Sequence, residues 1–392
     1  MVYLETEARR LVVQAGKQLV ESGLIARTWG NISARISNTQ FVITPSGMAY
    51  ETLLPEQIVT VNIDDCSYDG NIKPSSEKGI HADVYRLRPE ANFVIHTHQT
   101  KASVMSIMGR DLTEYSLESS EIFGTCIPCA EYGISSTKTL RKAVAKAVSS
   151  NPKSQAILLR NHGVLCIGSD YLYAFVIART LETVCANAIE AIVLRKSALP
   201  KYSDELRRSW YLHSIVKNQV NPPPCPDLGN SWRNRNLFTL EYEQKIYHFD
   251  LNALPTNLFK VAAIHAKIYQ SSRVSHIIHV TDPEVLTVSR TGKTMNPSID
   301  DLAQIAGINI RCSDESSVAR KLKNRNAVFV RNSGALCTGN TALDAEACGM
   351  VLKKGCEAEI FSVFLPKQNQ LGLFDALIQR TFYVLKYSKL KK

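Results

Sequence analysis

The chain lacks the sequence features that would assign it to a membrane, an oxidising compartment or a nucleic acid. Its N-terminal residues, MVYLETEARR, are charged where a secretory signal needs an apolar run, and no segment approaches about 18 uncharged apolar residues. Ten cysteines form no regular framework, and a lone pair at Cys126 and Cys129 is most simply incidental. The net charge is +10, but the basic residues are dispersed and carry no stacked aromatic pattern. We expect a cytoplasmic protein with reduced thiols and no membrane or nucleic-acid partner.

The length predicts two domains. A chain of 392 residues with 45% hydrophobic content exceeds one ordinary domain and can form well-packed cores. Residues 218–236, NQVNPPPCPDLGNSWRNRN, place four prolines within five positions and break every periodic pattern. We therefore predict a first domain over 1–217, a Pro/Asn-rich linker over 218–236 and a second domain over 237–392.

The first domain alternates helical and strand patterns. Helical periodicity covers residues 5–22, 137–149 and 172–194. Short apolar runs typical of strands start near Phe41, Ile58, Phe93 and Ala156. This alternation predicts an α/β fold in which helices cover a sheet.

Three histidines follow the strand patterns. His96 and His98 end the run NFVI, and side chains two positions apart on an extended chain point to the same side. His162 follows the run AILLR in a predicted turn, Asn161-His162-Gly163. Imidazole is the commonest ligand for a borderline divalent metal, and a catalytic zinc takes three protein ligands and leaves one position open. The histidines are candidate metal ligands, although a His-x-His pair by itself also suits a protein core and the turn could be a turn alone.

A carboxylate stands at a predicted helix start. Glu77 follows Ser75 and Ser76 and opens a helical pattern whose apolar residues share one face: Ile80, Val84 and Leu87. This places its carboxylate at a helix start, with free backbone donors close by, and a carboxylate near three metal ligands would make a catalytic site. The alternative is that the Ser-Ser-Glu segment only caps the helix.

The second half repeats the first in degraded form. Residues 261–288 match 77–104 with a one-residue gap, and residues 326–352 match 155–181. Apolar framework positions survive, but three of the four candidate site residues change: Glu77 is met by Val261, His98 by Thr281 and His162 by Ser333, while His96 keeps His279. A single histidine cannot hold a catalytic zinc, so we predict a second domain without the metal site.

Six motifs in order resemble the class II aldolase/adducin family, in particular its L-fuculose-phosphate-type aldolases. They are Gly30-Asn31-Ile32-Ser33, Thr44-Pro45-Ser46-Gly47, Ser75-Ser76-Glu77, His96-Thr97-His98, the segment from Ile127-Pro128 to Tyr132, and His162-Gly163. The resemblance covers about residues 5–205 well and 255–365 more faintly. It implies two tandem three-layer (α/β/α) domains, the second degenerate.

The resemblance also implies roles for individual residues. His96, His98 and His162 would bind one Zn²⁺, which acts as a Lewis acid, while Glu77 moves a proton at the reacting carbon. Tyr132 matches the tyrosine that protonates the aldehyde oxygen from a neighbouring subunit, although Glu131 precedes it where these aldolases commonly have proline. The substrate phosphate would be bound by Asn31, Ser46, Gly47, Ser75 and Ser76. Small residues and donors at a helix start suit a dianion.

The implied function is a zinc-dependent lyase that reversibly cleaves a ketose 1-phosphate into dihydroxyacetone phosphate and a short aldehyde. Pentulose-phosphate 4-epimerases and methylthioribulose-phosphate dehydratases of the same family are alternatives, as is a non-catalytic, adducin-like interaction module. Family aldolases are tetramers with sites between subunits, so we expect a homo-oligomer, a dimer or tetramer, in which the second domain could take a neighbour's place.

Overall fold

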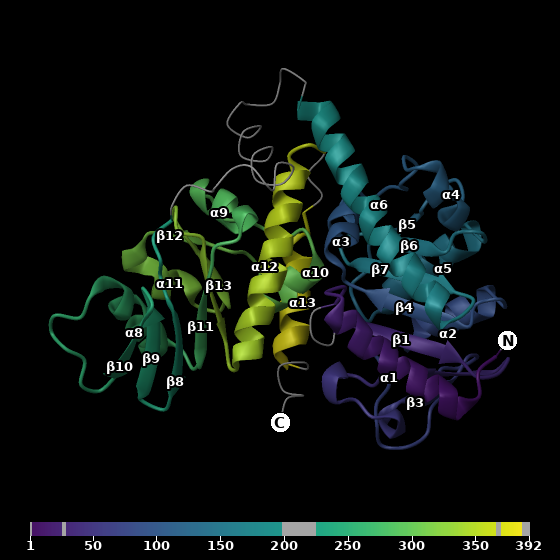
Figure 1. Cartoon of the computed structure of the whole chain (residues 1–392), viewed down its shortest axis with the longest axis horizontal. Helices are drawn as coiled ribbons and strands as arrows, with labels where there is room; N and C mark the ends of the chain where they lie inside the picture. Colours follow the sequence, from purple (N-terminus) through teal and green to yellow (C-terminus); the bar gives the residue numbers. More distant parts are fainter. Residues whose placement is uncertain (1, 26–28, 198–224, 366–369, 386–392) are drawn as a thin grey trace. The chain divides into compact units, whose positions relative to one another are not determined.

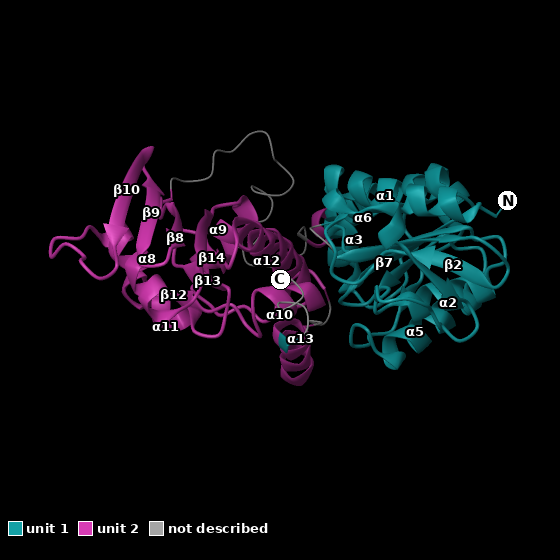
Figure 2. Cartoon of the chain, turned by 90° about the horizontal axis from the view of Figure 1, so that it is seen from below, with its two compact units in different colours: residues 1–192, 385–392 teal, residues 193–384 magenta. Residues whose placement is uncertain are grey.

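The computed structural model describes residues 2–25, 29–197, 225–365 and 370–385, which form two compact units (Figure 1, Figure 2). Unit 1 contains the described residues up to Ile192 together with Leu385, and unit 2 those from Val193 to Val384. The predicted domain boundary at residue 217, and residues 218–224 of the predicted linker, lie outside the described residues. Residues Asn230–Asn234 form a strand, so the second sheet begins inside the predicted linker. The neighbouring prolines had hidden the short strand pattern of SWRN.

Unit 1 is built on a seven-stranded sheet of order β3-β2-β1-β4-β7-β6-β5. The strands are β1 (Gly30–Arg35), β2 (Gln40–Ile43), β3 (Val59–Asn62), β4 (Phe93–Thr97), β5 (Cys129–Ala130), β6 (Ala156–Leu159) and β7 (Gly163–Gly168). Neighbouring strands are antiparallel, except that β5 and β6 are parallel. The four predicted strands are present as β2, β3, β4 and β6. All five residues of the central β4 are buried, as expected for a strand covered on both faces.

Helices cover both faces of this sheet (Figure 2). One face carries α1 (Glu5–Glu21), α3 (Thr100–Ser106) and α6 (Tyr171–Ser197). The other carries α2 (Lys78–Leu87) and α5 (Lys138–Ser150). Three short pieces complete the unit: α4 (Leu117–Phe123), η1 (Tyr50–Thr52) and η2 (Pro55–Gln57). The three predicted helices correspond to α1, α5 and α6, and the three-layer α/β architecture is confirmed.

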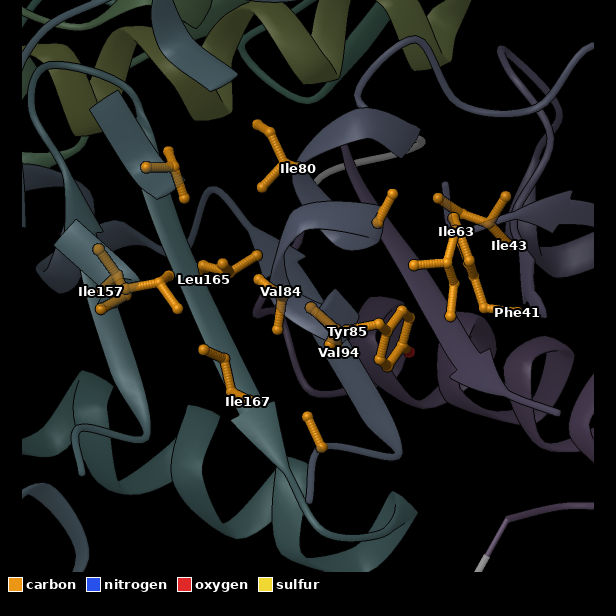
Figure 3. Close-up of a cluster of buried hydrophobic side chains, with 14 of the residues drawn as sticks. Phe41, Ile43, Ile63, Ile80, Val84, Tyr85, Val94, Ile157, Leu165 and Ile167 are labelled. Carbon is orange, nitrogen blue, oxygen red and sulfur yellow. The ribbon is translucent and has the colours of Figure 1, made fainter. Parts of the chain in front are cut away.

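The core between α2, α5 and the sheet follows from helical spacing (Figure 3). In α5, Leu140, Val144 and Val148 recur every four residues and are all buried, and the Thr137 side chain caps the helix by accepting from the Leu140 N–H. In α2, Val84 is fully buried, but Leu87 is 40% exposed. The predicted apolar face is therefore one residue shorter, because the helix ends at Leu87.

Helix α6 is a core helix despite its composition. Residues Tyr171–Lys196 are long and apolar enough to cross a membrane, and half of the most apolar stretch is buried inside the protein. Its Leu181 and Cys185 are fully buried. Between them, the Glu182 carboxylate accepts the backbone N–H groups of Lys101 and Ala102 at 2.7 and 3.1 Å. These contacts show that α6 packs against its own unit.

Unit 2 repeats the strand order as β10-β9-β8-β11-β14-β13-β12. The strands are β8 (Asn230–Asn234), β9 (Leu237–Tyr242), β10 (Lys245–Asp250), β11 (His276–Val280), β12 (Cys312–Ser313), β13 (Ala327–Val330) and β14 (Ala335–Gly339). The helices are α8 (Lys260–Ser271), α9 (Pro283–Arg290), α10 (Asp300–Ile305), η4 (Glu315–Ser317), α11 (Val318–Leu322), α12 (Ala342–Ser362) and α13 (Leu373–Leu385). Each strand has its counterpart in unit 1, so the predicted tandem duplication is confirmed.

Two apolar side chains of unit 1 differ in burial, and substitutions can test this difference. Ile157 on β6 is fully buried, so Ile157→Ala should lower the free energy of unfolding by about 2–5 kcal/mol through lost burial and a cavity. Leu87→Ala, at the exposed end of α2, is the control and should cost well under about 1.5 kcal/mol. Urea denaturation followed by circular dichroism measures both. An equal loss of unfolding free energy in the two variants would contradict the packing of unit 1.

Candidate metal centre

Strand β4 positions the first two histidines. His96 is the fourth residue of the strand and is 1% exposed, and His98 follows directly after the strand. The chain beyond His98 is fixed, because the Gln99 amide donates to the backbone carbonyl of Ala178 on α6 at 3.0 Å. Both imidazoles are thus held at one end of the central strand, as the two-residue spacing predicts.

The third histidine reaches this end from a tight turn. Asn161 has a φ of +58°, and the His162 N–H closes the turn on the Leu159 carbonyl at 3.0 Å. Strand β7 begins directly afterwards and pairs with β4, opposing Val164 to Thr97. The strand next to β4 is therefore β7, and the turn between β6 and β7 brings His162 to the end of β4.

Glycine is required inside this cluster. A Cβ atom on Gly163 would lie 2.5 Å from the carbonyl oxygen of Thr97. It would also come within 3.2 Å of the His98 ring and 3.3 Å of the His96 ring. The backbone of β7 can approach β4 and its histidines this closely only without a side chain.

The three rings converge on a common centre. One ligand atom from each of His96, His98 and His162 lies within 4.8 Å of the others. The Nε2 atoms of His96 and His98 are 3.2 Å apart, and ligand nitrogens around a tetrahedral zinc with bonds of about 2.0–2.1 Å are about 3.3 Å apart. In the part of the chain that the structure describes, this is the one group of three such ligands that come together.

Hydrogen bonding sets the protonation of His96 for metal binding. Its Nδ1–H donates to the backbone carbonyl of Val164 at 2.8 Å. A carbonyl only accepts, so Nδ1 carries a proton, and when the ring binds a metal as neutral imidazole its Nε2 lone pair faces the other histidines. The donor set, its spacing and this tautomer fit a divalent ion such as Zn²⁺.

Glu77 lies against the histidines and does not cap its helix. It occupies the N-cap position of α2, yet its side chain makes no capping hydrogen bond. Oε2 is 3.3 Å from Nε2 of His96, and Oε1 is 3.5 Å from Nε2 of His162. Burial alone would raise the pKa of Glu77, but the charge and hydrogen bonds of His96 and His162 outweigh it and lower the pKa well below its usual range. The carboxylate is therefore ionised.

Three further donors hold this carboxylate. Oε1 accepts from the Ser135 hydroxyl at 3.0 Å and from the Ser136 N–H at 3.3 Å. Oε2 accepts from the Asn31 amide at 3.2 Å. Neither serine is among the site residues predicted from the sequence. Their only signal was the Ser-Ser-Thr segment before α5, which has no local feature linking it to Glu77.

Two of the predicted phosphate-binding segments lie side by side. Residues 44–47 and 73–76 are joined by a bridge between Pro45 and Pro74. The Ser46 N–H donates to the Lys73 carbonyl at 2.9 Å, and the Ser75 N–H donates to the Thr44 carbonyl at 3.0 Å. Gly47 is exposed in a turn with a φ of +77°. Asn31 differs from these residues, because its amide faces Glu77.

Ser76 and Tyr132 lie near the start of α5. The Ser76 hydroxyl hydrogen-bonds that of Ser136 at 2.8 Å, and Tyr132 is half-buried in the loop between β5 and α5. A pocket of about 160 Å³ opens beside Glu77. Hydroxyls and basic side chains line it: Ser76, Ser136, Thr137, Lys78, Lys138 and Arg141. Such a lining favours anionic groups.

The sequence profile of the class II aldolase and adducin N-terminal domain matches residues 10–189 and 235–360. The chain belongs to this family. The 5-deoxy-D-ribulose 1-phosphate aldolase of Bacillus thuringiensis serovar kurstaki is 34% identical over 180 residues, 46% of this chain and 82% of that protein. The L-fuculose phosphate aldolase of Escherichia coli K12 is 29% identical over 196 residues, 50% of this chain and 88% of that protein.

Solved structures of the same family are also similar. An L-fuculose 1-phosphate aldolase shares 28% identity with a TM-score of 0.45, over 52% of this chain and 93% of that one. The L-fuculose-1-phosphate aldolase from Thermus thermophilus shares 28% identity with a TM-score of 0.41, over 49% of this chain and 97% of that one. The 34% identity with the 5-deoxy-D-ribulose 1-phosphate aldolase and the family match support assigning this protein to the lyases.

In unit 2, the counterpart of His96 is His279, and its ring makes different hydrogen bonds. His279 on β11 donates from Nε2 to the Ser333 carbonyl at 2.6 Å and accepts at Nδ1 from the Leu228 N–H at 3.1 Å. Both ring nitrogens are thus occupied by the backbone. Val261 and Ser333 stand at the positions of Glu77 and His162, so the unit has no equivalent ligand set among its described residues.

The internal repeat supplies a matched test of metal binding. His96→Ala should abolish stoichiometric zinc, because it removes one of three ligands, whereas His279→Ala at the same sheet position of unit 2 should leave the zinc content unchanged. Mass spectrometry of the metal content after dialysis measures both. Full zinc retention by His96→Ala would show that the histidines are not the site.

Proposed function

We propose that this class II aldolase family member is a zinc-dependent lyase that reversibly cleaves a ketose 1-phosphate into dihydroxyacetone phosphate and a short aldehyde. The observation that carries the proposal is the meeting of three histidine ligands with an ionised, buried carboxylate at one end of β4. The substrate class comes from the relatives, whose names specify L-fuculose phosphate and 5-deoxyribulose 1-phosphate.

His96, His98 and His162 would hold the ion. When bound, Zn²⁺ would supply Lewis-acid stabilisation of the negative charge that develops on the substrate oxygens as the carbon–carbon bond breaks. The tautomer of His96, fixed by Val164, keeps its ligand nitrogen available for this purpose. The turn at Gly163 lets the three rings surround one position.

Glu77 would transfer the proton at the carbon next to the carbonyl. In the condensation direction the ionised carboxylate would remove that proton, and in the cleavage direction it would first take up a proton and then donate it to this carbon. Hydrogen bonds from Ser135, Ser136 and Asn31 restrict the carboxylate to one orientation. The entropy cost of orienting it is therefore met by the fold and not during the reaction.

The remaining predicted residues would bind and protonate the substrate. Ser46, Gly47, Ser75 and Ser76 present small side chains, hydroxyls and a helix start, which suit a phosphate dianion. Asn31 belongs to the same set by family resemblance. We assign Tyr132 the protonation of the aldehyde oxygen.

The epimerase and dehydratase alternatives use a similar metal site, and Glu77 after two serines favours the aldolase over them. An adducin-like, non-catalytic role suits unit 2, which keeps the framework without the ligands. We propose a cytoplasmic homo-oligomer, a dimer or tetramer, in which unit 2 contributes to assembly.

A substrate assay tests the reaction class. The purified protein should release dihydroxyacetone phosphate from at least one member of a panel of ketose 1-phosphates, and the rate should fall to background with a chelator and return with zinc. A coupled dehydrogenase assay measures the release. The lyase proposal is wrong if the zinc-loaded protein releases dihydroxyacetone phosphate from every substrate only at the background rate and the chelator does not change that rate.

Removing the charge of Glu77 tests its role separately. Glu77→Gln keeps the shape of the side chain but cannot transfer a proton, so kcat should fall by about 10²–10⁴-fold. Steady-state kinetics measures this, and an unchanged zinc content serves as the control. Near-wild-type turnover would assign the proton transfer to another group.

A further inference from the structure

A buried chain of hydrogen bonds lies behind Glu77. The Tyr85 hydroxyl is 2.7 Å from Oγ of Ser33, which is 2.6 Å from Nδ1 of His81. The Nε2 atom of His81 bonds Oδ1 of Asn31, and Nδ2 of Asn31 donates to Oε2 of Glu77. Ser33 and His81 are fully buried, and Asn31 is 5% exposed. The chain thus connects the core of unit 1 with the candidate metal centre.

Unit 2 contains the inner part of the same chain, and there its direction is fixed. The Tyr269 hydroxyl is 2.7 Å from Oγ of Ser231, which is 2.6 Å from Nδ1 of His265. Nε2 of His265 is 2.8 Å from the backbone carbonyl of Leu228. Because a carbonyl cannot donate, Nε2 of His265 carries the proton and Nδ1 accepts from the Ser231 hydroxyl, which in turn accepts from Tyr269.

The same direction applies to His81, whose distance to its serine is equal. Burial lowers the pKa of His81 to about 3 and that of His265 to about 4, so each ring is neutral and carries one proton. With this proton on Nε2, His81 requires an acceptor at Asn31, so the amide oxygen of Asn31 faces His81. The amide nitrogen then faces Glu77 and donates to its Oε2 at 3.2 Å.

We propose that Asn31 is a positioning residue whose amide, locked in one orientation by His81, holds the Glu77 carboxylate toward the histidines. This inference rests on the proposed function of Glu77. If the amide were flipped, its oxygen would face a carboxylate oxygen at 3.2 Å and its nitrogen would face a donor. Both hydrogen bonds would be lost, so the hydrogen bond from His81 to the amide oxygen excludes the flipped amide.

The duplication separates the structural part of the chain from the functional part. The Tyr-Ser-His portion occurs in both units, including the one without a metal site, and therefore serves the fold. The step from His81 through Asn31 to the carboxylate occurs in unit 1, where the ligands are. In unit 2 a backbone carbonyl replaces the amide, and Val261 replaces the carboxylate.

Asn31→Asp tests the proposal with a nearly isosteric change. It keeps an acceptor for His81 but replaces the donor that faces Glu77 with an oxygen. We expect kcat for ketose 1-phosphate cleavage to fall about 10- to 100-fold and zinc content to remain stoichiometric, with a rise in KM in addition because the family resemblance also places Asn31 at the substrate phosphate. A raised KM with unchanged kcat would overturn the proposal, because it would place Asn31 on the substrate phosphate alone.

A matched pair of substitutions controls for loss of stability. Ser33→Ala and Ser231→Ala remove the same hydroxyl from the two copies of the chain. Ser231→Ala should leave kcat unchanged, whereas Ser33→Ala should lower kcat because it loosens the ring that orients Asn31. Equal kcat for both variants and the wild type would show that the Tyr-Ser-His hydrogen bonds support the fold and do not affect catalysis.

The proton arrangement can be measured without activity or metal. Long-range ¹H–¹⁵N NMR of the metal-free wild-type protein, labelled at histidine, should show His81 and His265 as the same Nε2–H tautomer. Assignment uses His81→Gln and His265→Gln. An Nδ1–H tautomer at His81 would overturn the lock even if the protein proves to be an aldolase. Conversely, an Nε2–H tautomer in a protein without aldolase activity would refute the proposed function and leave the hydrogen-bond direction intact.

Discussion

The antiparallel pairing of β4 with β7 is the contact on which the candidate site depends. It sets Val164 beside Thr97, so the turn before β7 and the residues ending β4 meet at one edge of the sheet. A side chain at Gly163 would collide with the Thr97 carbonyl and press on the rings of His96 and His98. A shift of the pairing by one residue would turn His96 to the other face of the sheet. The geometry of the metal ligands is therefore a property of strand register rather than of flexible loops.

The buried carboxylate is the second constraint, and its surroundings compensate the cost of burying a charge. Glu77 accepts hydrogen bonds from Asn31, Ser135 and Ser136 and lies against two imidazoles. Leaving such a group unpaired would cost several kcal/mol. The carboxylate consequently ties α2, the loop before α5 and β1 together at the site.

Local sequence patterns predicted the parts of the site that lie on single elements. The two-residue period placed His96 and His98 on one side, the Asn-His-Gly turn placed His162, and the helix start placed Glu77. The contacts of Ser135 and Ser136 with Glu77 span almost 60 residues of sequence, so no periodicity could reveal them. For the same reason the sequence did not show that the Asn31 amide faces Glu77. The strand at Asn230 was missed because prolines dominate its surroundings.

The hydrogen bonds of His279 distinguish unit 2 from unit 1 beyond the exchanged side chains. Its ring is fastened on both nitrogens to the main chain of Ser333 and Leu228, whereas the Nε2 atom of His96 in unit 1 faces the other histidines. Reintroducing histidine at 281 and 333 and glutamate at 261 would restore the residue types but not an available lone pair at 279. The two units therefore differ in how the main chain holds this histidine as well as in the side chains around it.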